Sequence, residues 1–145
     1  MGNIDANTAF TIKMGINNMQ TGAFVDAEKN YFAAPQQLNA QQQIIGHSHV
    51  VIEKLTSLTQ TTPLDPTQFA FFQGLNSVAV DGVLTADVSS GLPPGAYKLS
   101  SINTASNHQP ALVPVAQHGS LDDAIYVCRF YLIYRLFSVI LYLPN

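Results

Sequence analysis

The sequence predicts an all-β protein, an antiparallel immunoglobulin-like β-sandwich of about seven or eight strands. Short runs of alternating apolar and polar residues recur along the chain, and turn sequences rich in proline and glycine separate them. No long segment shows apolar residues at the helical period of about 3.6. Because a half-buried strand presents one apolar face, this pattern is typical of two sheets packed together.

The N-terminal part begins with the clearest strand pattern. Alternation in Phe10–Ile16 gives a single apolar face made of Phe10, Ile12, Met14 and Ile16. Asn17 and Asn18 favour a turn that ends this strand. An extended stretch is predicted at Tyr31–Pro35, because the residue before a proline avoids the helical region. Residues Gln36–Gln43 are predicted to form a short helix or a polar loop.

A central strand is predicted at Ile44–Leu55, where His47, His49 and Glu53 share one face. The opposite face carries Ser48, Val50 and Ile52. Further strands are predicted at Phe69–Phe72, Val83–Val88, Tyr97–Ile102, Ala111–Val115 and Ala124–Val127. Turn signals lie between them at Thr62-Pro63, Asp65-Pro66, Asp81-Gly82, Pro93-Pro94-Gly95 and His118-Gly119.

The connection Leu92–Tyr97 carries the most specific fold signal. Its sequence, Leu-Pro-Pro-Gly-Ala-Tyr, lies between two predicted strands and resembles the tyrosine corner of immunoglobulin-like sandwiches. The hydroxyl of Tyr97 is therefore predicted to bond the upstream backbone.

Composition excludes several classes of partner. Of the 145 residues, 10% are charged and the formal net charge is −3, so the chain offers no basic patch for nucleic acid or an anionic membrane surface. The single cysteine, Cys128, excludes an intrachain disulfide. Residues Met1–Asp5 show neither a basic nor an apolar signal region, which leaves two readings, an intracellular protein or a fragment.

The amino-acid composition of the sequence changes near Val127. Residues 1–127 are assigned to the β-sandwich domain, and residues 128–145 to a continuation of the last strand followed by an atypical hydrophobic tail. Arg129 and Arg135 interrupt this tail, so its apolar run falls far short of the roughly 20 residues that span a bilayer. An exposed, charge-poor apolar tail favours self-association.

The candidate functional side chains of the chain are its four histidines, His47, His49, His108 and His118. His47 and His49 are two apart on a predicted strand, so their imidazoles lie side by side and can chelate a metal such as copper or zinc. The remaining ligands would come from His108, His118, Asp122 or Asp123. Two alternatives stay open. The histidines hydrogen-bond loop backbone, since an unsatisfied buried polar group costs about 1–3 kcal/mol, or they act in acid-base catalysis.

Other chemistry is less well supported by the sequence. No strained Gly-x-Ser-x-Gly elbow surrounds Ser120, and Cys128 lies in the atypical tail, so no catalytic residue is assigned. A second binding feature is aromatic. Two interpretations stay open for these aromatic residues: a stacking surface for sugar rings, or burial in the core, which is more common in a sandwich. The residues are Tyr31, Phe32, Phe69, Phe71 and Phe72.

Three segments, Asn30–Ala40, Ile44–Glu53 and Ser101–Ala124, carry the motifs YFAAPQQLNA, GHSHVVIE and SLDDA. With them the chain resembles a family of uncharacterised secreted fungal proteins over about Phe10 to Val127. The resemblance implies an extracellular or cell-wall setting and brings no established activity. In that family a signal peptide and an extension precede the domain, and the last strand continues without this tail. The His-x-His strand and the His118-Gly119 turn are also similar to copper-zinc superoxide dismutases, whose remaining ligand spacing is missing here.

The sequence therefore leads to two hypotheses of different kinds. The first is a non-enzymatic extracellular or cell-wall binding domain that contacts neutral polysaccharide through amides, hydroxyls and aromatic rings. The second is a histidine-based copper or zinc protein, with or without redox activity.

Overall fold

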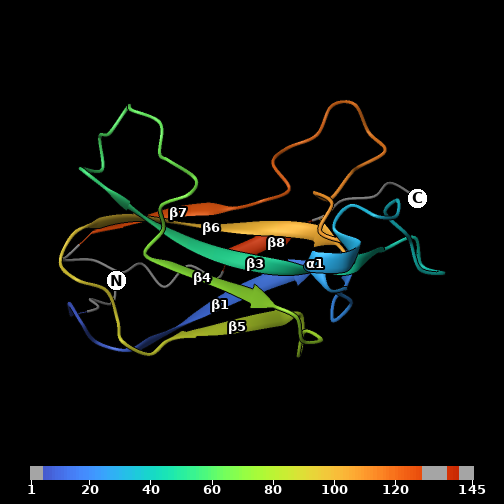
Figure 1. Ribbon diagram of the computed structural model, residues 1–145, viewed down its shortest axis with the longest axis horizontal. Helices are drawn as coiled ribbons and strands as arrows, with labels where there is room; N and C mark the ends of the chain where they lie inside the picture. Colours follow the sequence, from blue (N-terminus) through green and yellow to red (C-terminus); the bar gives the residue numbers. More distant parts are fainter. Residues whose placement is uncertain (1–4, 129–136, 141–145) are drawn as a thin grey trace.

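The computed structural model describes residues 5–128 and 137–140, and its regular structure is mostly β, arranged in two sheets (Figure 1). The smaller sheet has the order β5-β1-β8, formed by Val83–Val88, Phe10–Asn17 and Phe137–Ile140. The larger sheet has the order β2-β3-β6-β7, formed by Met19–Gln20, Ile44–Leu55, Ala96–Ala105 and Ala124–Cys128. Strand β4, Phe71–Leu75, pairs with β3 on the edge opposite β6.

The core lies between the two sheets. From β1, alternate residues Ile12, Met14 and Ile16 point inward, as their period-two pattern predicts. They pack with side chains from β5 and from the larger sheet, among them Leu84, Val88, Val50, Ile52 and Leu99. The two inner faces thus cover each other, and the opposite face of β3 is left for other contacts.

The prediction of purely antiparallel pairing is wrong in two places. Strand β1 runs parallel to β8, and β2 runs parallel to β3. Asn18, in the left-handed region at φ 54, separates β1 from β2, and there the chain passes from one sheet to the other. A long connection, residues 21–43, then returns the chain before β3 begins, and a connection of such length is what parallel neighbours need.

Two predicted strands coincide with the structure, Ile44–Leu55 and Val83–Val88. The strand predicted at Phe69–Phe72 instead spans Phe71–Leu75, because pairing with β3 begins at Phe71 opposite Ile52. The strand predicted at Ala111–Val115 is not formed. Prolines at 110 and 114 remove two backbone donors there, and Leu112 bonds the side chain of Gln36 instead.

The stretch Gln36–Gln43 is a polar loop rather than a helix, held by the side chain of Asn39, which bonds Gln43 and Gln41. The one helix among the described residues, α1 (Ala27–Asn30), was not expected. It begins after Asp26, whose carboxylate accepts a hydrogen bond from the backbone of Glu28.

Tyr97 forms the predicted backbone hydrogen bond. Its hydroxyl donates to the carbonyl of Pro93 at 2.8 Å, and its ring is buried in the core. This contact fixes the turn into β6, the strand that pairs with β3 along ten positions.

The predicted continuation of the last strand to about Phe130 lies outside the described residues, as do Arg129 and Arg135. In the described part of the tail, residues 137–140 pair with β1 from Met14 to Asn17. Among the described residues, no helix has the length and apolarity needed to cross a bilayer.

Candidate metal centre

Strand β3 places His47 and His49 side by side on its outer face. Because Val50 and Ile52 point into the core, the alternating positions 47 and 49 point away from it. The two imidazole centroids are 4.8 Å apart. The register with β6 sets His47 opposite Thr104 and His49 opposite Ile102. The predicted pair on one face of a strand is therefore present.

A tight turn after β6 brings His108 to this pair. The backbone N–H of His108 donates to the carbonyl of Ala105 at 3.0 Å, and His108 has a φ of 69. Its ring centroid lies 4.6 Å from that of His47 and 5.8 Å from that of His49. A residue other than glycine in this conformation costs on the order of 1–3 kcal/mol, and such strain is concentrated at functional sites.

The long connection before β3 covers the same end of the sheet. Backbone N–H groups of Ala23, Val25 and Phe32 donate to the carbonyls of Gly46, Ser106 and Asn107, at 3.1, 2.9 and 2.9 Å. The side-chain amide of Asn107 also donates to the carbonyl of Ala34. These bonds join the connection both to β3 and to the turn that carries His108. The histidines themselves lie on two parts of the chain, β3 and this turn, and the connection holds the two together.

The three imidazoles are close enough to share a metal ion. One nitrogen from each of His47, His49 and His108 lies within 4.8 Å of the others. Ligands at about 2.0–2.1 Å from one tetrahedral zinc ion are about 3.4 Å apart. The set therefore needs to contract on binding, by small rotations of the side chains.

Two of the ring nitrogens have no hydrogen-bond partner among the described residues. The Nδ1 atoms of His49 and His108 are buried, and no described group hydrogen-bonds either of them. A buried polar atom left in this way costs about 1–3 kcal/mol.

The contacts of His47 leave its Nε2 atom as the one that can bind a metal. Its Nδ1 lies 3.1 Å from the carbonyl oxygen of Ala23, and since a carbonyl only accepts, this contact requires Nδ1–H and leaves the lone pair on Nε2. The hydroxyl of Thr104 lies 3.3 Å from that Nε2. A hydrogen bond from a ligand's second nitrogen to a carbonyl is the usual way in which a metal-binding histidine is oriented.

Burial keeps the imidazoles of His47 and His49 neutral. It lowers the pKa of His47 to about 4, with help from the neighbouring rings of His49 and His108. Burial, together with His108, also lowers the pKa of His49. At neutral pH both rings are therefore unprotonated, which is the form that binds metals.

His118 and the acidic candidates are not part of this cluster. His118 is exposed, and its Nδ1 lies 2.7 Å from the carbonyl oxygen of Gly119. The carboxylate of Asp122 accepts from the backbone of Asn103 at 2.8 Å, and that of Asp123 accepts from the backbone of Ala124 at 2.8 Å. The alternative of backbone hydrogen bonding thus describes His118 and the Nδ1 atom of His47, whereas the Nδ1 atoms of His49 and His108 depart from it.

Sequence reasoning missed the aromatic surroundings of the site. The ring of Phe24 meets that of His47 edge-on, with centroids 6.0 Å apart. Tyr31 lies beside His108 at 5.9 Å, and Phe72 beside His49 at 5.3 Å. Tyr31 and Phe72 had been noted in the sequence only as candidates for sugar stacking, and Phe24 carried no signal.

Comparison with known proteins places these residues within one family domain. Residues 1–129 match the family described as the CLU5d N-terminal domain. The protein named "Pathogenicity cluster 5 protein d" from the fungus Colletotrichum graminicola is 47% identical over 124 residues, which cover 84% of this chain and 26% of that protein. The chain thus spans about a quarter of the length of this relative. No solved structure matches the chain.

Proposed function

The chain belongs to the CLU5d N-terminal domain family, and we propose that the domain binds one zinc or copper ion through His47, His49 and His108. The observation that carries this proposal is the pair of buried Nδ1 atoms, on His49 and His108, that have no hydrogen-bond partner among the described residues and lie beside His47.

The ligand set supports these metals over others. Imidazole nitrogen suits zinc and copper, whereas calcium and magnesium prefer oxygen ligands. Three protein ligands also leave one position of a four-coordinate ion for water or another molecule. The proposed centre is therefore of the open kind rather than a closed structural site.

Metal titration of the purified chain tests the proposal. After dialysis against a chelator, calorimetry with Zn²⁺ and with Cu²⁺ is expected to give one ion per chain for at least one of them. The variants His49→Gln and His108→Gln are each expected to lower the affinity at least about tenfold, equivalent to about 1.4 kcal/mol. His118→Gln is the matched control, because His118 lies outside the cluster.

The electron paramagnetic resonance spectrum of the Cu²⁺-loaded protein supplies a direct readout of the ligands. Hyperfine splitting from several nitrogens is expected in the parent chain and reduced splitting in His49→Gln. If neither metal binds, or if the affinity is the same in the parent and in both variants, the three histidines are not a metal site.

A secreted setting is a separate proposal. We infer that the domain works outside the cell or at the cell wall, as a binding domain rather than an enzyme. The support is the resemblance to secreted fungal proteins and a surface with few charges. Recovery of the full-length protein from culture medium or wall extracts is the expected result, and retention of all of it inside the cell would contradict the proposal.

We also propose that the two sheets follow the immunoglobulin-like arrangement. The support is the hydrogen bond from Tyr97 to Pro93 at the start of β6, together with the face-to-face packing of the sheets. An experimental structure tests this through its strand order.

A further inference from the structure

Two pairs of aromatic side chains flank the three histidines. Tyr31 and Phe32 stack on each other with centroids 4.3 Å apart, and Tyr31 lies 5.9 Å from His108. On the other side, Phe72 lies 5.3 Å from His49, and Phe69 lies 5.6 Å from Phe72. Since His49 and His108 are themselves 5.8 Å apart, the rings form one unbroken series across the site.

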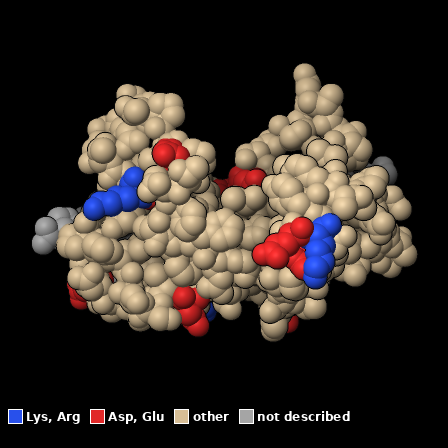
Figure 2. All heavy atoms as spheres, in the orientation of Figure 1, with Lys and Arg blue, Asp and Glu red and all other residues tan. Residues whose placement is uncertain are grey.

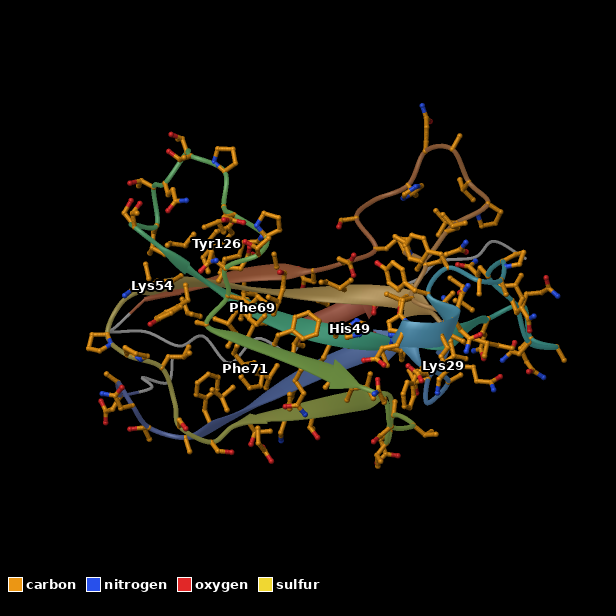
Figure 3. The ribbon with its side chains drawn as sticks, in the orientation of Figure 1. Lys29, His49, Lys54, Phe69, Phe71 and Tyr126 are labelled. Carbon is orange, nitrogen blue, oxygen red and sulfur yellow. The ribbon has the colours of Figure 1, made fainter. Side chains whose placement is uncertain are left out.

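The four outer rings, Tyr31, Phe32, Phe69 and Phe72, are here called the aromatic platform. They are 61%, 48%, 54% and 46% exposed, whereas Phe71, between the last two, packs against the core. Figure 3 labels Phe69 on the segment that leads into β4. These rings add nothing to the packing between the sheets, and clustered exposed apolar surface of this kind marks an interaction site.

One of these rings is held in place by the backbone. Phe32 has a φ of 55, in the left-handed region, and its N–H donates to the carbonyl of Asn107 at 2.9 Å. A bulky residue in this conformation is strained. The chain therefore maintains the stacked pair of Tyr31 and Phe32 at a cost in stability, next to the turn that carries His108.

The surroundings of the platform are close to neutral. Charged side chains are few on the face in view, and on its right side a basic side chain lies directly beside acidic ones (Figure 2). Two of the lysines are matched by carboxylates, Lys29 by Asp26 at 3.1 Å and Lys98 by Glu53 at 2.9 Å. A strongly charged ligand would therefore find little opposite charge, and an uncharged partner fits this face.

Two long loops project from the larger sheet (Figure 1). Residues 56–70 join β3 to β4 and residues 106–123 join β6 to β7. In the first loop the side chains of Thr59, Gln60 and Thr67 hydrogen-bond within the loop itself, and in the second the amide of Gln117 is exposed. A pyranose ring has apolar C–H faces, which match flat aromatic rings, and a rim of hydroxyls, which match exposed amides and hydroxyls.

We propose that the aromatic platform binds a neutral polysaccharide of β-linked pyranoses, whose flat faces stack on its rings. A chain that contacts both pairs of rings crosses the histidines, so a metal ion held there faces the bound sugar. The four platform rings are not metal ligands, and the inference therefore goes beyond the proposed metal site and stands without it.

Co-sedimentation of the whole chain with insoluble polysaccharides tests this inference. The probes are cellulose, chitin and a β-1,3-glucan, in buffer that contains a chelator. At least one of them is expected to retain the protein, and the double variant Phe69→Ala with Phe72→Ala is expected to bind it at least about tenfold less tightly, a change of about 1.4 kcal/mol. Tyr31→Ala should weaken binding in the same direction.

Val80→Ala is the matched control, because Val80 is an apolar side chain that is 73% exposed and lies outside the platform. Thermal unfolding of each variant verifies that the fold is kept. The variants His49→Gln and His108→Gln are expected to lose metal binding and to keep polysaccharide binding in chelator, which separates failure of this inference from failure of the metal site.

Several results would overturn the inference. One is that none of the three probes retains the parent chain, and another is that the platform variants bind as well as Val80→Ala. Equal retention on the polyanion polygalacturonate would show that a neutral ligand is not selected. If the parent chain is a dimer and the double variant Phe69→Ala with Phe72→Ala is a monomer, the platform is a self-association surface instead.

Discussion

The buried histidine of β3 makes the stability of the metal-free domain depend on pH. His47 is fully buried, and its pKa in the folded chain is about 4, compared with 6.5 for the free side chain. The unfolded chain therefore binds a proton more readily than the folded chain between these values. It follows that stability is fully present above about pH 6.5 and is lost as the pH falls towards 4.

The magnitude follows from the difference between the two pKa values. A separation of 2.5 units, 6.5 minus 4, at about 1.36 kcal/mol for each unit, gives a loss of roughly 3 kcal/mol. The pKa of His49 is also lowered by burial, and its effect has the same sign. Asp122 acts in the opposite direction, because burial raises its pKa.

Urea denaturation at pH 7.5 and pH 4.0, with a chelator present, measures this loss. The comparison with His47→Gln isolates it, since the contribution of Asp122 is common to both proteins and cancels. We expect the parent chain to lose more unfolding free energy between these pH values than the variant does, by roughly 3 kcal/mol. Equal losses in the two proteins would refute the argument that His47 is buried in its neutral form.

Two further predictions concern the framework that holds the site. Ile12→Ala is expected to lower the free energy of unfolding by about 2–5 kcal/mol, because Ile12 is buried between the sheets. The control Thr11→Ala removes only an exposed hydrogen bond to Asp87 and should cost much less. Equal effects of the two variants in denaturation experiments would contradict the assignment of faces in β1. Tyr97→Phe removes the donor to Pro93 and is expected to cost about 1 kcal/mol; an unchanged melting temperature would show that this hydrogen bond does not support the turn into β6.

Local pattern decided much of the fold. The period of two in Phe10–Ile16 and in Ile44–Leu55 fixed which side chains face the core, because successive side chains of a strand alternate. The same rule put His47 and His49 together. Tyr97 could be predicted to bond the backbone because the turn before it resembles the tyrosine corner of immunoglobulin-like sandwiches.

Pairing between strands could not be obtained in this way. The parallel neighbours of β1 and β3 depend on where distant parts of the chain return, and period-two alternation is the same for parallel and antiparallel partners. The start of β4 was also misplaced, because the apolar run at 69–72 is ambiguous in register until β3 supplies a partner.

The sequence alone identified histidines as the candidate ligands of this chain and determined that two of them share a face of one strand. Only the tertiary structure decided that His108 joins them and that His118 does not. Both follow a polar residue near a turn, and their sequences give no way to separate them. His108 reaches the cluster because β6 pairs with β3 and a left-handed turn then directs it back over the sheet, contacts that depend on packing between segments far apart in the chain.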